Sequence, residues 1–135
     1  MNEDRLKALH EQLDGSMSVL SMIKRGDITK TPQGDMLVGD VFAWSIYSDA
    51  STNVIVSEYK KGDLWPHHEH LDSIEFLICT EGSFTVTTEV SEGKLENVLT
   101  KGQCIKVPPH ILHSVKANED GKLIAVCIPP EKGYQ

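Results

Sequence analysis

Histidines are gathered in two short segments of this chain, and both segments could supply metal ligands. Three of the six histidines fall within residues 67–70, in the run HHEH, and His110 and His113 follow about forty residues later. In a β-strand, residues i and i+2 point to the same face, so His68 and His70 can direct two imidazoles toward one point. The sequence therefore offers a pair of converging metal ligands.

A carboxylate and a third imidazole could complete such a site. Glu75 follows His70 by five residues, at the start of the next expected strand, and His113 enters a later strand. Imidazole with carboxylate suits Fe, Mn, Ni, Co, Cu or Zn. Four protein ligands on a six-coordinate ion leave two positions for substrate and water, or substrate and O2. The alternative is that HHEH is a set of surface histidines near a turn.

The segments that must position these residues have the pattern of short β-strands. Apolar and polar residues alternate along several of them, and turn signals such as KKGD and SEGK separate them. Many short strands at close spacing indicate an all-β sandwich or barrel, without the long alternating helices of a parallel α/β sheet. The expected strands lie around residues 42–46, 54–56, 74–80, 83–90, 95–100, 104–107, 112–117 and 122–128.

The length of 135 residues predicts a single domain. Residues 1–40 are expected to form an N-terminal helix and arm that pack on the barrel or on a partner chain. The helix is placed over residues 1–14, because leucines recur there at helical spacing. Residues 41–128 are expected to form the barrel, and residues 129–135 a loosely held tail.

Composition and charge exclude several classes of function. Apolar residues make up 39% of the chain and charged residues 24%, which is ordinary for a globular protein. A net charge of -7 argues against binding nucleic acid or an anionic membrane surface. The charged N-terminus does not have the pattern of a signal peptide, and no apolar run approaches the length of a membrane span. We expect a cytoplasmic protein.

Glycine and proline spacing around the histidines resembles the two motifs of the cupin family. Residues 62–82, GDLWPHHEHLDSIEFLICTEG, resemble the first motif, G-x5-H-x-H-x4-E-x6-G, in every position. Residues 102–115, GQCIKVPPHILHSV, resemble the second, G-x5-P-x-G-x2-H-x3-N, with two departures. His110 occupies the glycine position, and Ala117 occupies the asparagine position, with Asn118 one step late. The resemblance covers roughly residues 40–128, about two-thirds of the chain.

The resemblance implies an all-β fold, a cupin jelly-roll β-barrel of six to eight strands with a metal in its interior. It implies one divalent transition metal per chain, bound by His68, His70, Glu75 and His113. It also implies a homodimer through outer strands and the N-terminal arm. A glycine at a tight turn supplies positive φ, and histidine is among the residues that tolerate this region, so we expect His110 to hold the turn.

Other residues near the site have two interpretations each. His110 either fills its turn or acts as a proton shuttle or substrate contact, and it is the one candidate catalytic side chain. Strand parity predicts that His67 and Glu69 point away from the histidine pair. Further residues are expected either to line a pocket or to pack in the core: Trp65, Cys79, Phe84 and Val86. Asp72 is expected to be exposed, and Cys79, Cys104 and Cys127 are expected to be buried, reduced thiols.

These observations favour a metal-dependent enzyme that acts on a small anionic or enolisable molecule. Dioxygenase-like chemistry is one possibility for such a site, and decarboxylation, isomerisation or lyase chemistry on an oxo-acid or phenolic compound is another. The alternative is a non-enzymatic module that binds a metal or metabolite. A third interpretation is a structural site in which the metal only holds the fold together. No helix-turn-helix pattern accompanies the strands, so direct action on DNA is not expected.

Overall fold

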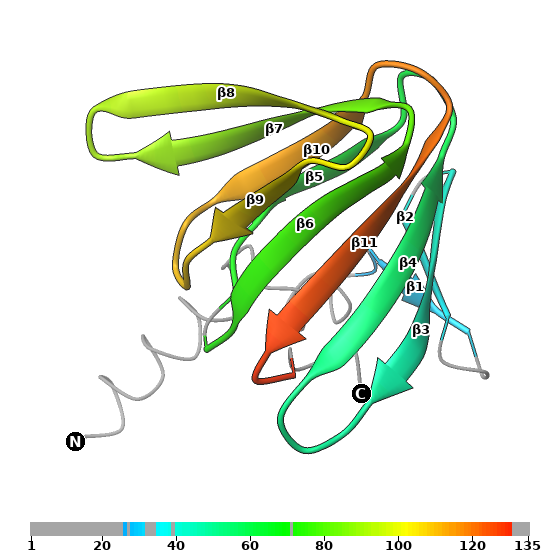
Figure 1. Ribbon diagram of the computed structural model, residues 1–135. Coiled ribbons are helices and arrows are strands. Elements are labelled where there is room, and N and C mark those ends of the chain that lie inside the picture. Colours follow the sequence, from blue (N-terminus) through cyan, green and yellow to red (C-terminus); the bar gives the residue numbers. More distant parts are fainter. Residues whose placement is uncertain (1–25, 27, 32–34, 39, 71, 131–135) are drawn as a thin grey trace.

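The computed structural model describes residues 26, 28–31, 35–38, 40–70 and 72–130 (Figure 1). These residues form eleven β-strands, which confirms the all-β prediction. The predicted helix over residues 1–14 and most of the predicted tail lie outside the described residues. No helix among the described residues is long and apolar enough to cross a membrane.

The strands form two antiparallel sheets, coloured along the chain in Figure 1. The larger sheet has seven strands, in the spatial order β1 (Thr29–Lys30), β2 (Met36–Val38), β3 (Val41–Ser48), β4 (Asn53–Tyr59), β11 (Gly121–Ile128), β6 (Ile74–Glu81) and β9 (Cys104–Val107). The smaller sheet has four strands, in the order β5 (Leu64–His68), β10 (His113–Ala117), β7 (Ser83–Val90) and β8 (Gly93–Thr100). The total exceeds the six to eight strands implied by the resemblance, partly because β1 and β2 extend the larger sheet.

Alternating side chains of both sheets form one apolar core. Along β6, Leu77 and Cys79 are buried while Phe76 and Ile78 are half-buried. Along β7, Phe84 and Val86 are fully buried, so for these two residues the core interpretation holds. This alternation arises because successive residues of a strand point to opposite faces of the sheet.

Strands that are distant in the sequence lie side by side and position the site. In the smaller sheet, β10 lies between β5 and β7, and its first residue, His113, pairs with His68. In the larger sheet, β6 lies between β11 and β9, and Glu75 pairs with both Cys127 and Val107. The fold therefore brings His68 and His113 together on one sheet and Glu75 onto the other.

A β-bulge in β5 changes which of its side chains point inward. Trp65 pairs with Val115 and His68 pairs with His113, so three steps along β5 match two steps along β10. The extra residue interrupts the alternation, and Trp65 and His68 are both buried. Pro66 lies in the same stretch, which is possible because β5 is an edge strand and proline has no N–H to donate.

Gly82 connects the two sheets at a crowded turn between β6 and β7. Its φ is +82°, and a Cβ atom there would lie 2.6 Å from the carbonyl oxygen of Asp120. Only glycine avoids both the backbone strain and this clash. The turn therefore fixes the path from β6, which carries Glu75, to the smaller sheet.

The prediction that all three cysteines are buried is wrong for one of them. Cys79 and Cys127 are buried, but Cys104 is exposed. Cys104 opens β9, an edge strand in which only Val107 is fully buried. Residues of β9 alternate between the two faces of the sheet. Val107 lies on the face that packs in the core, and Cys104 lies on the other face, which is exposed. None of these three cysteines forms a disulfide.

Candidate metal centre

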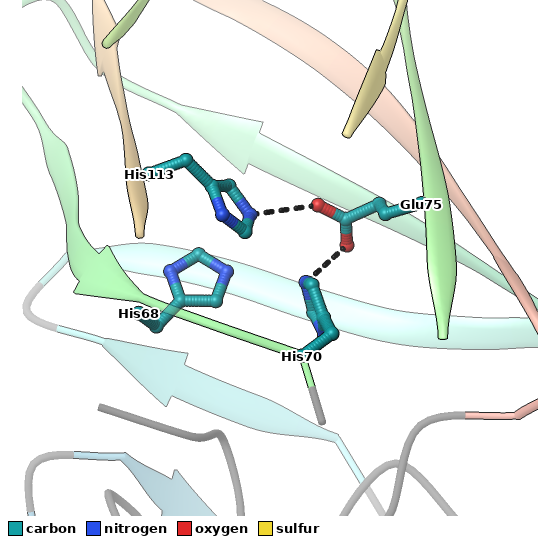
Figure 2. Close-up of side chains that lie close together, drawn as sticks. All are labelled: His68, His70, Glu75 and His113. Carbon is teal, nitrogen blue, oxygen red and sulfur yellow. Dashed lines mark hydrogen bonds and ion pairs between the residues drawn. The ribbon is translucent and has the colours of Figure 1, made fainter. Parts of the chain in front are cut away.

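His68, His70, Glu75 and His113 meet in the interior between the two sheets (Figure 2). One ligand atom from each residue lies within 4.8 Å of those of the other three. The four residues are almost completely shielded from solvent, with exposed fractions of 0% to 3%. The structure thus brings together the four residues that the sequence identified as candidate ligands.

The carboxylate of Glu75 bridges two of the imidazoles. Its Oε1 lies 3.1 Å from Nε2 of His113, and its Oε2 lies 3.1 Å from Nε2 of His70. The His68 ring completes the cluster, with its centroid 4.1 Å from that of His113 and 5.1 Å from that of His70. Figure 2 shows the three rings and the carboxylate around a common centre.

Main-chain carbonyls determine which nitrogen of two histidines carries hydrogen. Nδ1 of His68 lies 2.9 Å from the carbonyl oxygen of Pro66, and Nδ1 of His113 lies 2.8 Å from that of Ile111. A carbonyl oxygen can only accept a hydrogen bond, so each Nδ1 is the donor. In the neutral rings, Nε2 then carries a lone pair, which is the form that binds a metal.

This arrangement places hydrogen-bond acceptors against each other. The unprotonated Nε2 of His113 faces a carboxylate oxygen at 3.1 Å, and such a contact is stable only with a proton or a cation between them. No lysine or arginine among the described residues forms an ion pair with Glu75. A divalent cation at the centre would satisfy the lone pairs and neutralise the buried carboxylate.

Burial and neighbouring charge shift the titration of the cluster. Burial by itself would raise the pKa of Glu75, but the charges of His70 and His113 and their hydrogen bonds lower it well below its ordinary value. Burial, together with repulsion from the other two imidazoles, lowers the pKa of His68. A deprotonated Glu75 and a neutral His68 are the forms that ligate metals, and a bound cation would take the place of the protons on His70 and His113.

The dimensions of the cluster fit a transition metal after a small contraction. Bonds of about 2.1 Å from imidazole nitrogen or carboxylate oxygen separate opposite ligand atoms by about 4.2 Å. The widest separation in the cluster is at most 4.8 Å, so shifts of a few tenths of an ångström suffice. The four residues therefore form a candidate metal site by donor type, burial and spacing.

A small cavity borders the cluster. It has a volume of about 30 Å³, and its lining includes His68 and Glu75 from the cluster itself. Trp65 also lines it, which agrees with the pocket interpretation of that residue. The indole N–H of Trp65 is buried and has no acceptor among the described residues. The cavity gives a ligand of the metal somewhere to extend.

His110 lies outside the cluster but is tied to it through the main chain. Its φ is +65°, as expected for a residue in a glycine position, and its side chain is exposed. Its N–H donates to the carbonyl oxygen of His70 at 2.8 Å. The structure therefore gives His110 a role in holding the turn, and its predicted catalytic role stays a prediction.

The remaining predicted residues have simpler positions. His67 is half-buried, with Nε2 3.8 Å from Oε1 of Glu89, and it does not belong to the cluster. The thiol of Cys79 lies 3.4 Å from the carbonyl oxygen of Gly82, so it packs in the core and does not line the cavity. Asp72 is exposed, as predicted.

Sequence reasoning missed three contributors to the site. The carbonyls of Pro66 and Ile111 each lie two residues before a histidine of the cluster, and this shared spacing was a usable signal. Cys127 was assigned to packing alone, but its thiol lies 3.5 Å from Oε2 of Glu75. That contact depends on the pairing of β11 with β6, which no local pattern reveals.

Comparison with known proteins agrees with this architecture. A family model described as Cupin domain matches residues 55–129, which is more than half of the chain. No curated protein matches the sequence.

Solved structures from several organisms have the same fold. KdgF from Halomonas sp. is 17% identical with a TM-score of 0.65, and the match covers 83% of this chain and 94% of that one. An RmlC-like cupin from Shewanella frigidimarina is 22% identical with a TM-score of 0.64, covering 80% and 87%. The Cnp3 cupin domain of Schizosaccharomyces pombe is 18% identical with a TM-score of 0.59, covering 67% and 65%. At these identities the similarity establishes the fold.

Proposed function

The chain belongs to the cupin domain family, and on this premise we propose that it is a metal-dependent enzyme acting on a small molecule. His68, His70, Glu75 and His113 are the ligands of one divalent transition metal in this proposal. The observation that carries it is the convergence of buried lone pairs on one centre, with no lysine or arginine among the described residues to neutralise Glu75.

The protein side chains hold and orient the reacting groups in this proposal. A divalent metal bound there would supply Lewis-acid polarisation or, if redox-active, activation of O2. His68 and His113 present fixed Nε2 atoms because their Nδ1 atoms are held by carbonyls. The burial of the cluster excludes bulk water, which strengthens electrostatic interactions at the centre.

The substrate class we propose is an oxo-acid or phenolic compound that coordinates the metal through oxygen. Dioxygenase-like oxidation is the first reaction to test, and decarboxylase, isomerase or lyase chemistry follows, because the same ligand set hosts all of them. His110, exposed at the turn that contacts His70, is the candidate for proton transfer. The competing proposal is a non-enzymatic module that binds the metal or a metabolite without turnover.

Elemental analysis of the purified chain tests the metal site first. We expect about one transition-metal ion per chain in the wild type and none in His68→Ala. The control is His67→Ala, because His67 adjoins His68 but stands outside the cluster. Full metal occupancy in His68→Ala would contradict the ligand assignment.

Turnover then separates the enzyme from the binding module. The metal-loaded chain is mixed with catechols, thiols and oxo-acids, and O2 consumption and product formation are followed. Turnover that disappears in His113→Ala supports the enzyme. Tight binding of one of these compounds without any product supports the module.

We also propose that the chain forms a homodimer through its outer strands. Exposed apolar side chains on β8 support this, with Leu95 55% and Val98 59% exposed. Light scattering of the purified chain measures its mass directly. A monomer at micromolar concentration would contradict the dimer.

A further inference from the structure

The cavity beside the cluster has an apolar wall contributed by both sheets. Six of its lining side chains are aliphatic: Ala43, Ile55, Leu77, Leu123 and Ala125 from the larger sheet, and Val115 from the smaller one. Trp65, Tyr59 and Ser57 complete the wall next to His68 and Glu75. None of these lining residues is a lysine or an arginine. Among the described lining residues, only Glu75 carries a negative charge, and it belongs to the cluster.

Such a wall cannot accept a second charge on the ligand. A carboxylate or phosphate that enters an apolar cavity loses its hydration, and none of the described lining residues is a lysine or arginine that could replace it. The positive charge of a bound metal acts at the cluster end, where the ligand coordinates. The part of the ligand that points away from the metal must therefore be uncharged.

The polar groups of the wall are already neutral or engaged. The Ser57 hydroxyl donates to the carbonyl oxygen of Leu123 at 3.3 Å. Burial raises the pKa of Tyr59, so its hydroxyl stays protonated at ordinary pH. Neither group supplies a charge that could bind an ionic substituent.

The size of the cavity limits the uncharged part. A volume of about 30 Å³ holds roughly two or three groups of the size of a water molecule or a methylene. A sugar ring or an extended acid exceeds that space. A two- or three-carbon substituent fits it.

Resting on the metal site proposed above, we infer that the ligand coordinates the metal through one end and buries a short, uncharged apolar substituent in this cavity. Compounds with an anionic group at that second end are excluded. The inference narrows the substrate class from oxo-acids and phenolics in general to those whose second end is small and apolar.

Hydroxamic acids test this, because their metal-binding end stays constant while the tail varies. The full chain is loaded with cobalt(II), and binding of acetohydroxamic, propanohydroxamic, butanohydroxamic and hexanohydroxamic acid is measured by calorimetry. Each methylene that enters the cavity should strengthen binding about threefold to fourfold. The gain should stop after two or three carbons, because the cavity is then full.

A matched pair of probes isolates the effect of charge. Succinic monohydroxamic acid has nearly the same length as butanohydroxamic acid, but a carboxylate replaces the terminal methyl group. We expect the acid to bind at least about tenfold more weakly. Equal or tighter binding of the acid would overturn the inference.

Enlarging the cavity should increase the tail length at which the gain in affinity stops. Leu77→Ala removes part of the wall on β6, and Ile55→Ala does the same on β4, so that one variant serves if the other fails to fold. In either variant, the gain in affinity should continue to hexanohydroxamic acid. Ile46→Ala, an exposed change on β3 outside this cavity, should leave the wild-type limit unchanged.

The two proposals fail in different ways. The inference about the apolar cavity is wrong if the chain binds cobalt normally but the affinity for hydroxamic acids does not depend on tail length. It is also wrong if the tail length at which the gain stops is the same in both enlarged variants as in the wild type. In either case the metal site itself still stands. If the wild-type chain does not bind cobalt while it is folded by circular dichroism, the metal site itself is wrong, and the inference falls with it.

Discussion

Two main-chain carbonyls determine which ring nitrogen can bind a metal in two histidines of the cluster. Pro66 has no N–H and lies in an edge strand, and its carbonyl oxygen accepts a hydrogen bond from Nδ1 of His68. Ile111 provides the same contact for His113 from the loop before β10. Because backbone atoms hold both rings, their lone pairs are oriented before any ion binds, which reduces the entropy lost on binding.

Trp65 offers a test of the cavity wall at one residue. Its side chain is only 5% exposed, and its indole N–H finds no acceptor among the described residues. Trp65→Phe loses apolar contact but also removes an unsatisfied donor, whose burial costs about 1–3 kcal/mol. We expect the two effects to offset each other, so that the free energy of unfolding changes by less than about 1 kcal/mol.

Denaturant unfolding measures this change, and Trp65→Ala is the matched comparison. That variant leaves a void in the wall and should lower the free energy of unfolding by about 3–5 kcal/mol. If Trp65→Phe is as damaging as Trp65→Ala, the indole N–H has an important partner and the description of the wall is incorrect.

The loop before β10 holds its shape through a residue in the left-handed region. His110 has φ of +65°, and its N–H contacts the carbonyl of His70. Glycine adopts this region without Cβ strain, although it also gains freedom in the unfolded chain. We expect His110→Gly to raise the free energy of unfolding by about 0.5–1 kcal/mol and to leave metal occupancy unchanged.

The same replacement at an ordinary strand position is the control. Lys116→Gly, at an exposed position of β10, should lower the free energy of unfolding by roughly 0.5–1 kcal/mol. A loss of stability in His110→Gly would show that the imidazole makes a contact that outweighs the strain. If His110→Gly instead loses turnover and keeps its stability, this result would support proton transfer by His110.

The turn between β3 and β4 is organised by one carboxylate. Asp49 accepts hydrogen bonds from the Tyr47 hydroxyl and from the N–H groups of Ser51 and Thr52, and these bonds lower its pKa to about 2. A lowered pKa in the folded state means that the carboxylate stabilises the turn above about pH 4 and loses this effect as the pH falls through about 2.

Carbon-detected NMR titration of the Asp49 carboxyl group measures this pKa. The Tyr47 hydroxyl is the largest cause of the shift, so Tyr47→Phe should move the pKa toward the ordinary value of 3.8. An ordinary pKa in the wild-type chain would show that the turn does not hold these bonds in solution.

Local pattern was enough to predict most strands of the fold. The alternation in SFTVTTEV predicts a strand over 83–90, and β7 has those bounds. CIKV likewise corresponds to β9. The exposure of Cys104 was not predictable in this way, because it depends on β9 lying at the edge of the sheet. Period-2 patterns specify strands, but they do not specify the neighbours of those strands.

The β5 bulge shows the same limit within the candidate site. Simple parity would place Trp65 on the face opposite His68, and the bulge turns both inward. Its position depends on the register with β10, about fifty residues away in the sequence. The four cluster residues were predictable because their spacing within each segment, together with the family resemblance, identifies them. Which of the two interpretations of Trp65 holds was not predictable, because it depends on this register.

The cluster joins the two sheets across the interior of the molecule. His68 and His113 belong to the smaller sheet, His70 lies two residues beyond the end of β5, and Glu75 belongs to the larger sheet. A metal bound to all four would cross-link sheets that are otherwise held by apolar packing and chain connections. Metal binding and global stability should therefore be coupled.

This coupling predicts that metal binding raises the melting temperature of the whole chain. An ion that binds only the folded state stabilises it by about 2.7 kcal/mol at a free concentration one hundred times its dissociation constant, which corresponds to a shift of several degrees. Calorimetry of metal-stripped protein, before and after adding cobalt(II), measures the shift, and excess chelator should reverse it. His67→Ala should respond like the wild type, whereas His68→Ala should show no shift, because one sheet has lost a ligand. An equal shift in His68→Ala would mean that the ion acts elsewhere on the molecule and that the four buried side chains do not bind it.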